Sequence, residues 1–168
     1  MLSKTILDKL NTQINLEYYS ANLYLQMSSW CLSQSLDGCA FFLRQHSNEE
    51  KGHGQQLFDY VNETGSMSLI GKIKAPKAEY ESVLKVFQAT YEHECFITKE
   101  INDLASAAFT EGDFSTFNFL QWYVAEQHEE EHLFKSILEK IKMINTEGKG
   151  LFFIDKEIRR IAETRGSK

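Results

Sequence analysis

The residues best suited to metal chemistry are Glu50 and His53, in the middle of a helix expected over about residues 37–64. Residues three apart share one face of a helix, so this carboxylate and imidazole can bind one ion together. A single Glu-x-x-His pair is weak evidence, because most such pairs are solvated neighbours. This pair gains weight because it lies on the face that a bundle helix turns toward its core. The other residues of that face are Cys39, Leu43, His46, Leu57, Tyr60 and Thr64.

Three further segments carry an inward face of the same kind, and with the first they predict an all-α four-helix bundle in a single domain of residues 1–168. The four segments are about residues 3–32, 37–64, 80–110 and 114–144. The connection from Ser66 to about Glu79 holds the only proline, Pro76, and is long enough to cross the bundle from end to end. Short links elsewhere give the one-crossover form of the bundle. A short fifth, C-terminal helix is expected over about residues 151–162.

Each of the four apolar faces is interrupted near its midpoint by one acid. The acids are Glu17, Glu50, Glu94 and Glu130. All four reach one level of the bundle whichever way the helices run, and no Lys or Arg occupies an inward position. Buried unpaired carboxylates are costly and repel one another, so a pair of divalent cations is the favoured explanation. Oxygen ligands with one imidazole suit iron or manganese and leave zinc possible; the alternative is four surface glutamates turned inward by a wrong choice of register.

Three other residues share these inward faces. Tyr24 lies two turns from Glu17, as either a core tyrosine with a hydrogen-bond partner or a redox-active neighbour of the metals. His46, two turns before His53, is more often a satisfied core histidine than a ligand. Gln127 lies one turn before Glu130.

Three acids lie beside the inward faces rather than on them. Glu49 adjoins Glu50, and Glu126 and Glu129 flank the face of the fourth segment. Such a run is ordinarily a solvated charged surface. If this wall of the bundle faces a cavity, the three acids form a site for a further cation.

The composition of the chain argues against several classes of function. The chain has 168 residues, 42% of them hydrophobic, and a net charge of −6, which argues against nucleic-acid binding because no basic arm relieves it. No apolar run approaches a membrane span, and the N-terminal residues lack the apolar region of a signal peptide. Cys31, Cys39 and Cys95 form no close pair, so free thiols in a reducing cytoplasm are expected.

The chain resembles a bacterial non-haem ferritin over nearly its whole length, from Leu10 to Lys156. The most specific stretch is TFNFLQWYV, residues 116–124, followed by EQHEEE, residues 126–131. Ferritin-like di-iron proteins are a known example of a carboxylate-filled bundle core. The resemblance implies a shell of twenty-four identical subunits that oxidises Fe(II) with dioxygen. It also implies that the shell stores the product as a ferric oxyhydroxide mineral, for iron storage and detoxification.

The same resemblance implies roles for individual residues. Those that match the ligands of the first iron are Glu17, Glu50 and His53, and those for the second are Glu50, Glu94 and Glu130. Those that match a third iron site on the cavity side are Glu49, Glu126, Glu129 and Glu130. Gln127 matches a hydrogen-bonding residue near the second iron, and Tyr24 matches a tyrosine beside the di-iron centre.

Related families fit less well. Lys51 follows Glu50 where bacterioferritins carry a haem-ligating methionine, so no haem is expected, and the four cysteines of a rubrerythrin are absent. Phe117 and Leu120 fall in the region of the acidic pores of animal ferritins, which leaves the route of iron into the shell open. Two alternative functions are a non-catalytic cage that protects DNA and a di-iron oxidase that acts on an organic substrate.

The choice of helical register can be tested with two histidines. Glu129 and His132 form a second Glu-x-x-His pair, but on a mostly polar face about 200° around the helix from Gln127 and Glu130. We expect His53→Ala to slow the fast phase of Fe(II) oxidation by orders of magnitude in stopped-flow absorbance. His132→Ala should stay within about twofold, or about 0.4 kcal/mol in barrier. Loss of the fast phase in His132→Ala would mean that the fourth helix is rotated wrongly.

Overall fold

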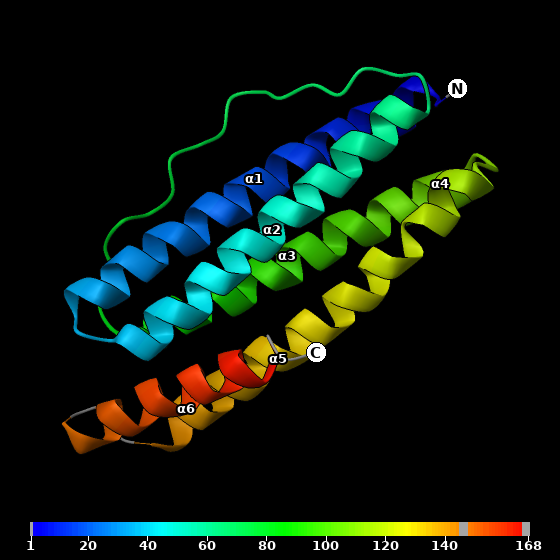
Figure 1. Cartoon of the computed structure of the whole chain (residues 1–168). Coiled ribbons are helices and arrows are strands. Elements are labelled where there is room, and N and C mark those ends of the chain that lie inside the picture. The colour runs from blue at the N-terminus through cyan, green and yellow to red at the C-terminus, as the bar shows by residue number, and fades with distance from the viewer. Residues whose placement is uncertain (1, 145–147, 166–168) are drawn as a thin grey trace.

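The computed structural model describes residues 2–144 and 148–165, and its regular elements in these ranges are all helices. They are α1 (Lys4–Ser33), α2 (Asp37–Glu63), α3 (Val83–Thr110), α4 (Phe114–Phe119), α5 (Gln121–Met143) and α6 (Lys149–Arg165). α1 and α2 form one antiparallel pair, and α3 runs beside α4 and α5 as the other (Figure 1). The expected one-crossover bundle with a short C-terminal helix is confirmed.

Serine side chains fix where two of the long helices begin. Ser3 Oγ accepts a hydrogen bond of 3.1 Å from the backbone N–H three residues on, which caps α1. Ser82 does the same for α3 through Lys85 N at 3.3 Å. Such caps satisfy N–H groups that have no partner inside the helix. The third helix therefore begins at Val83, slightly later than its apolar pattern predicted.

The fourth helix, predicted as one element over residues 114–144, is broken at Leu120. Gln121 Nε2 donates to Phe117 O at 2.9 Å, so a side chain takes a carbonyl that a backbone N–H would use in an unbroken helix. Tyr123 N then bonds to Leu120 O at 3.0 Å in a tighter turn. A side chain inserted in this way is a known cause of helix kinks. Leu120 is fully buried, so it belongs to the core of the subunit.

Two asparagines hold the crossover, residues 66–79, along α1 (Figure 1). Asn15 Nδ2 donates to Leu69 O at 2.9 Å, and Asn15 Oδ1 accepts from Gly71 N at 2.7 Å. Asn11 Oδ1 accepts from Leu69 N at 2.8 Å. These bonds satisfy both backbone groups of Leu69 and the N–H of Gly71, and they fix this part of the crossover against α1.

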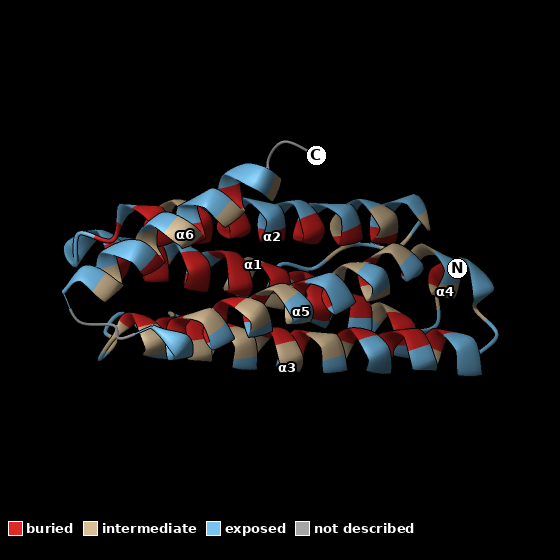
Figure 2. Ribbon diagram, turned by 90° about the horizontal axis from the view of Figure 1, so that it is seen from below, coloured by how far each residue is buried: buried red, intermediate tan, exposed pale blue. Residues whose placement is uncertain are grey.

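Buried residues lie along the sides of the helices that face one another (Figure 2). The apolar ones form two clusters. One cluster includes Phe42, Phe87 and Phe134, and the other includes Leu57 and Ile101. The predicted inward faces are buried except at the end of α2, where Tyr60 and Thr64 are half-buried. The inward acids therefore lie in a core that is closed above and below.

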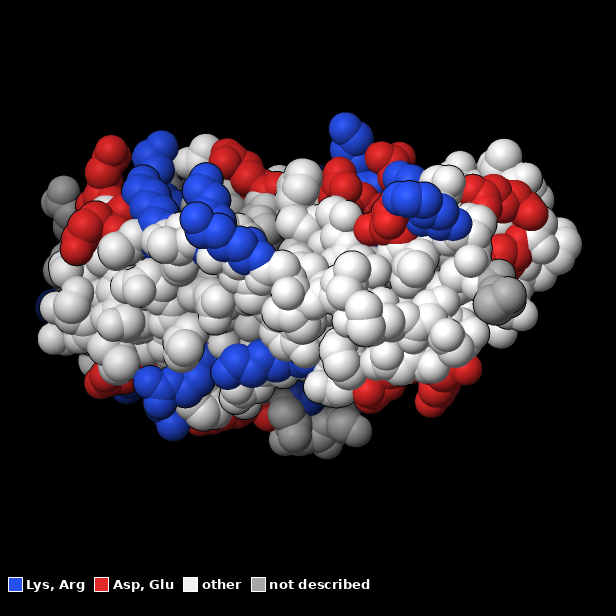
Figure 3. Space-filling model, turned by 90° about the horizontal axis from the view of Figure 1, so that it is seen from above, with Lys and Arg blue, Asp and Glu red and all other residues white. Residues whose placement is uncertain are grey.

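The surface on the crossover side carries few charges across its middle, and Lys, Arg, Asp and Glu gather toward its edges (Figure 3). The crossover adds Met67, Leu69 and Ile70, each at least 53% exposed. No helix in residues 2–144 and 148–165 is long and apolar enough to cross a membrane. Cys31, Cys39 and Cys95 are unpaired.

The C-terminal helix α6 is joined to the start of α2 by one carboxylate. Asp155 Oδ2 accepts from Gly38 N at 3.0 Å and Oδ1 accepts from Cys39 N at 2.8 Å. Leu36, the residue before α2, offers no side-chain cap, so Asp155 supplies the cap from another helix. The approach requires glycine, because a Cβ at Gly38 would lie 2.1 Å from Asp155 O. Behind this cap, α6 buries Ile154, Ile158 and Ala162.

Removing that cap should weaken the fold. We expect Asp155→Ala to destabilise the protein by about 1–2 kcal/mol, because two N–H groups at the start of α2 lose their acceptor. Asp155→Asn keeps one acceptor oxygen and should lose less. Thermal melting of both variants beside the parent chain measures the difference, and equal melting temperatures for all three would contradict the cap.

Candidate metal centre

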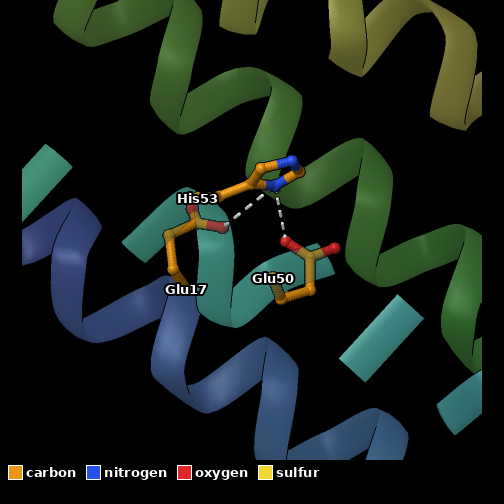
Figure 4. A group of neighbouring side chains, drawn as sticks. All are labelled: Glu17, Glu50 and His53. Atoms are coloured by element: carbon orange, nitrogen blue, oxygen red, sulfur yellow. Dashed lines mark hydrogen bonds and ion pairs between the residues drawn. The ribbon is translucent and has the colours of Figure 1, made fainter. Parts of the chain in front are cut away.

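A fully buried group of possible metal ligands is formed by Glu17 of α1 with Glu50 and His53 of α2 (Figure 4). His53 Nδ1 lies 3.0 Å from Glu50 Oε2 and 4.0 Å from Glu17 Oε2. One ligand atom from each lies within 4.8 Å of the others, and all three residues are buried. Because bonds from such atoms to a metal are about 2.0–2.2 Å long, the three atoms fit around one ion after small side-chain adjustments.

The oxygens of Glu17 have unequal surroundings. Oε1 accepts a hydrogen bond from the Gln13 side-chain amide, one turn earlier on α1. Oε2 is buried, accepts no hydrogen bond and faces His53. A buried carboxylate oxygen without a donor is destabilising unless a cation satisfies it. Gln13 was not singled out from the sequence, although its spacing from Glu17 places both on one helix face.

Glu94 of α3 is held by two donors. The Tyr24 hydroxyl donates to Oε1, and Gln127 Nε2 donates to Oε2 at 3.1 Å. Tyr24 therefore has the hydrogen-bond partner that a buried tyrosine needs, and that partner is a predicted metal ligand. Gln127 thus hydrogen-bonds to a predicted ligand of the second iron, and its role beside that iron stays a prediction.

The surroundings of three of the central acids disfavour their charged forms and raise their pKa values. Burial, followed by the neighbouring Glu50, raises the pKa of Glu17 well above its ordinary value. Burial and the charge of Glu94 raise the pKa of Glu50 in the same way. Burial also raises the pKa of Glu94 to about 7, against partial relief from Tyr24 and Gln127. A divalent cation among these groups would restore their charged forms.

Glu130 has a different environment from the other three acids. Its Oε1 accepts a hydrogen bond of 2.5 Å from Arg165 Nη2, and its Oε2 lies 3.3 Å from His46 Nε2. Burial alone would raise the pKa of Glu130, but His46 and Arg165 outweigh it and lower the pKa to about 2. Glu130 is grouped by distance with His46 and Glu49, not with Glu94. The predicted ligands of the second iron are therefore near one another without forming a closed set among the described residues.

His46 lies inside this second group, where the sequence favoured a core histidine. Its ring packs against Phe42 and Phe134, as a core residue would. Its Nδ1 bonds to Phe42 O at 3.0 Å, while Nε2 points to Glu49 Oε2 at 3.7 Å and to Glu130. His46 is thus fixed by the core on one side and turned toward acids on the other.

The flanking acids line a surface pocket of about 560 Å³ outside this group. Its lining residues are Glu49, Glu126, His128, Glu129, His132, Leu133 and Arg165. The pocket has room for a hydrated cation, since one water takes up about 30 Å³ of liquid volume. Glu129 and His132 are exposed whereas Gln127 and Glu130 are buried, as the choice of register expected.

A one-crossover bundle with buried carboxylates and an imidazole at its centre defines the ferritin-like class of metal-binding proteins. Comparison with known proteins agrees, because residues 7–144 match the family described as Ferritin, a ferritin-like domain. The bacterial non-haem ferritin of Escherichia coli O6:H1 is 54% identical over 158 residues, which cover 94% of this chain and 96% of that protein. That of Campylobacter jejuni is 53% identical, with 98% of this chain and 99% of the relative covered. The chain belongs to the ferritin family, and its predicted likeness to bacterial non-haem ferritins is confirmed.

Solved structures show the same relationship. An open-pore ferritin from the archaeon Archaeoglobus fulgidus superimposes with a TM-score of 0.92 at 42% identity, and covers 95% of this chain and 98% of its own. The Chlorobium tepidum ferritin is 57% identical with a TM-score of 0.85, and covers 95% of this chain and 98% of its own.

The raised pKa of Glu94 predicts how the metal-free protein responds to pH. A folded state that holds its proton more tightly than the unfolded state is fully stable below the ordinary value of 4.5 and loses stability as pH rises through about 7. Glu17 and Glu50 act in the same direction. We expect the metal-free melting temperature to fall between about pH 5 and pH 7.5.

Glu94→Gln isolates the contribution of this one group, because glutamine keeps the shape and cannot ionise. The fall in melting temperature should become smaller in this variant, and adding a divalent cation to the parent protein should oppose it. An equal fall in Glu94→Gln and in the parent chain would show that Glu94 carries its charge without penalty.

Proposed function

We propose that this protein stores and detoxifies iron, and that each subunit is a ferroxidase which oxidises Fe(II) to Fe(III) with dioxygen. The observation that supports this most directly is the buried group of Glu17, Glu50 and His53, whose ligand atoms lie within 4.8 Å of one another. Two carboxylates and one imidazole suit iron, which must be bound and then oxidised. The names of the relatives, bacterial non-haem ferritins, point to the same function.

In this proposal iron is the substrate, and the protein supplies spacing and charge. Glu17 and His53 bind the first Fe(II), and Glu50 lies between it and the second. Each Fe(II) gives up one electron, dioxygen takes up both, and hydrolysis of the ferric product releases protons. The second Fe(II) takes oxygens from Glu94 and Glu130, with Tyr24 and Gln127 holding Glu94 in place through the bonds described above.

A third iron site is proposed at the pocket that Glu49, Glu126 and Glu129 line. Glu130 adjoins it through its hydrogen bond with Arg165, which also lines the pocket. These acids lie outside the first group, so iron bound here can differ in affinity from the di-iron pair. Oxidised iron leaving the centre would meet the same acids before reaching the mineral.

Storage requires a container, so we propose that subunits assemble into a shell of twenty-four in the cytoplasm, with no haem. The weakly charged crossover face with its exposed Met67, Leu69 and Ile70 supports burial between subunits (Figure 3). Exposed apolar patches of this kind commonly mark contacts between proteins. Phe152 and Phe153, 57% and 62% exposed at the start of α6, offer a second contact surface.

Two other functions remain distinguishable by experiment. A DNA-protecting cage would retard plasmid DNA in the metal-free state, which a chain of net charge −6 is not expected to do. An oxidase for an organic substrate would work as a dimer and need an apolar cavity beside the metals, whereas the central acids lie between closed apolar clusters.

Titration with Fe(II) under air tests storage. We expect ultraviolet absorbance of ferric species to rise rapidly for two Fe(II) per subunit and then to continue slowly far beyond that ratio, in a particle of shell size by size-exclusion chromatography. The two phases follow because binding at the centre is stoichiometric and mineral growth is not. A monomer or dimer that saturates at two irons would contradict storage.

A further inference from the structure

The last residue that the structure describes, Arg165 at the end of α6, places its guanidinium among the acids of the proposed third iron site. Nη2 donates to Glu130 Oε1 at 2.5 Å and lies 4.0 Å from Glu49 Oε2. Nη1 lies 3.3 Å from His46 Nε2. A positive side chain therefore occupies a position between three groups that bind cations.

The orientation of the His46 ring places a possible metal ligand at the same position as the guanidinium. Its Nδ1 bonds to the backbone carbonyl of Phe42, which only accepts, so Nδ1 must carry a hydrogen. Nε2 is then the ring nitrogen left for a metal, and it lies 3.3 Å from Arg165 Nη1 and 3.3 Å from Glu130 Oε2. His46, Glu49 and Glu130 offer ligand atoms within 4.8 Å of one another. The guanidinium and a metal ion thus compete for the same nitrogen and oxygens.

We propose that Arg165 is a built-in cation that fills the third site in the metal-free subunit and sets the affinity of that site for metal. This inference rests on the proposed function, because it concerns the third iron site of that proposal. A divalent ion balances both Glu49 and Glu130, whereas one guanidinium balances a single charge, so sufficient metal displaces the arginine. The third site then loads only after the centre, at a higher concentration of Fe(II).

Because α6 is docked on the bundle, the exchange of Arg165 for a metal ion requires only its side chain to move. Asp155 and the buried Ile154, Ile158 and Ala162 hold the helix to the bundle. Arg165 follows Ala162 by less than one turn, and its side chain is 28% exposed in the acid-lined pocket. Rotation of one long side chain into solvent therefore frees the site, and α6 stays docked.

Isothermal titration of the assembled, metal-free protein with Co(II) tests the proposal without any oxidation. In Arg165→Gln and Arg165→Met, the weakest binding event should tighten by about tenfold or more, because no internal cation has to leave. Arg165→Lys should fall between these variants and the parent, since it keeps the charge but loses the two-pronged donor. Arg160→Gln is the matched control, because Arg160 is largely exposed and pairs with Glu157 of its own helix.

Adding Glu49→Gln to Arg165→Gln tests whether the weakest Co(II) binding event belongs to the third site. The effect of Arg165→Gln should shrink in that background, since the site has lost a ligand that no other proposed iron uses. Unchanged or weaker binding in both Arg165→Gln and Arg165→Met would overturn the proposal, because an occupying cation cannot be removed without raising affinity. If the parent chain and every variant fail to bind Co(II) tightly at the centre, the proposed function fails instead, which is a separate outcome.

Discussion

The burial of four carboxylates at one level of a helical bundle is the constraint on which the rest of the structure depends. Two apolar clusters exclude water above and below them, so their charges cannot be screened by solvent. The pKa values of Glu17, Glu50 and Glu94 rise as a result, which means that the apo protein holds these groups closer to neutrality. A site of this kind stores free energy that divalent cations release when they bind.

The acids are held in place by two kinds of hydrogen-bond donor, neutral side chains and one cationic side chain. Gln13 supports Glu17, while Tyr24 and Gln127 hold Glu94, and none of these donors neutralises the charge. Among the four acids, and within the part of the chain that the structure describes, only Glu130 pairs with a Lys or Arg side chain, that of Arg165. The difference separates a centre that favours protons or metal from an outer group that is already balanced by the chain itself.

The helices and the inward acids could be predicted because both follow from local periodicity. Each inward face can be identified from the 3.6-residue helical repeat alone. The four acids placed on these faces are all buried, namely Glu17, Glu50, Glu94 and Glu130. The break at Leu120 could not be predicted in this way, because it depends on one rotamer of Gln121. The role of Arg165 could not be predicted for another reason. Its partners His46 and Glu130 lie 119 and 35 positions away on other helices, and the docking of α6 brings them together. The sequence favoured a core position for His46, and its ring does pack on Phe42 while its Nδ1 bonds to the Phe42 carbonyl.

The two groups of ligands must also differ in what leaves when metal arrives. At the centre, groups with raised pKa values have to give up protons, so binding there strengthens as pH rises toward about 7, where Glu94 ionises. At the outer group, Glu130 has a pKa of about 2 and is already charged near neutrality. On the proposal that metal displaces Arg165, what departs from Glu130 is a guanidinium rather than a proton, so its own ionisation adds no pH dependence in that range. Under these proposals one bundle sets two affinities for metal, the first through burial and the second through a side chain carried by its C-terminal helix.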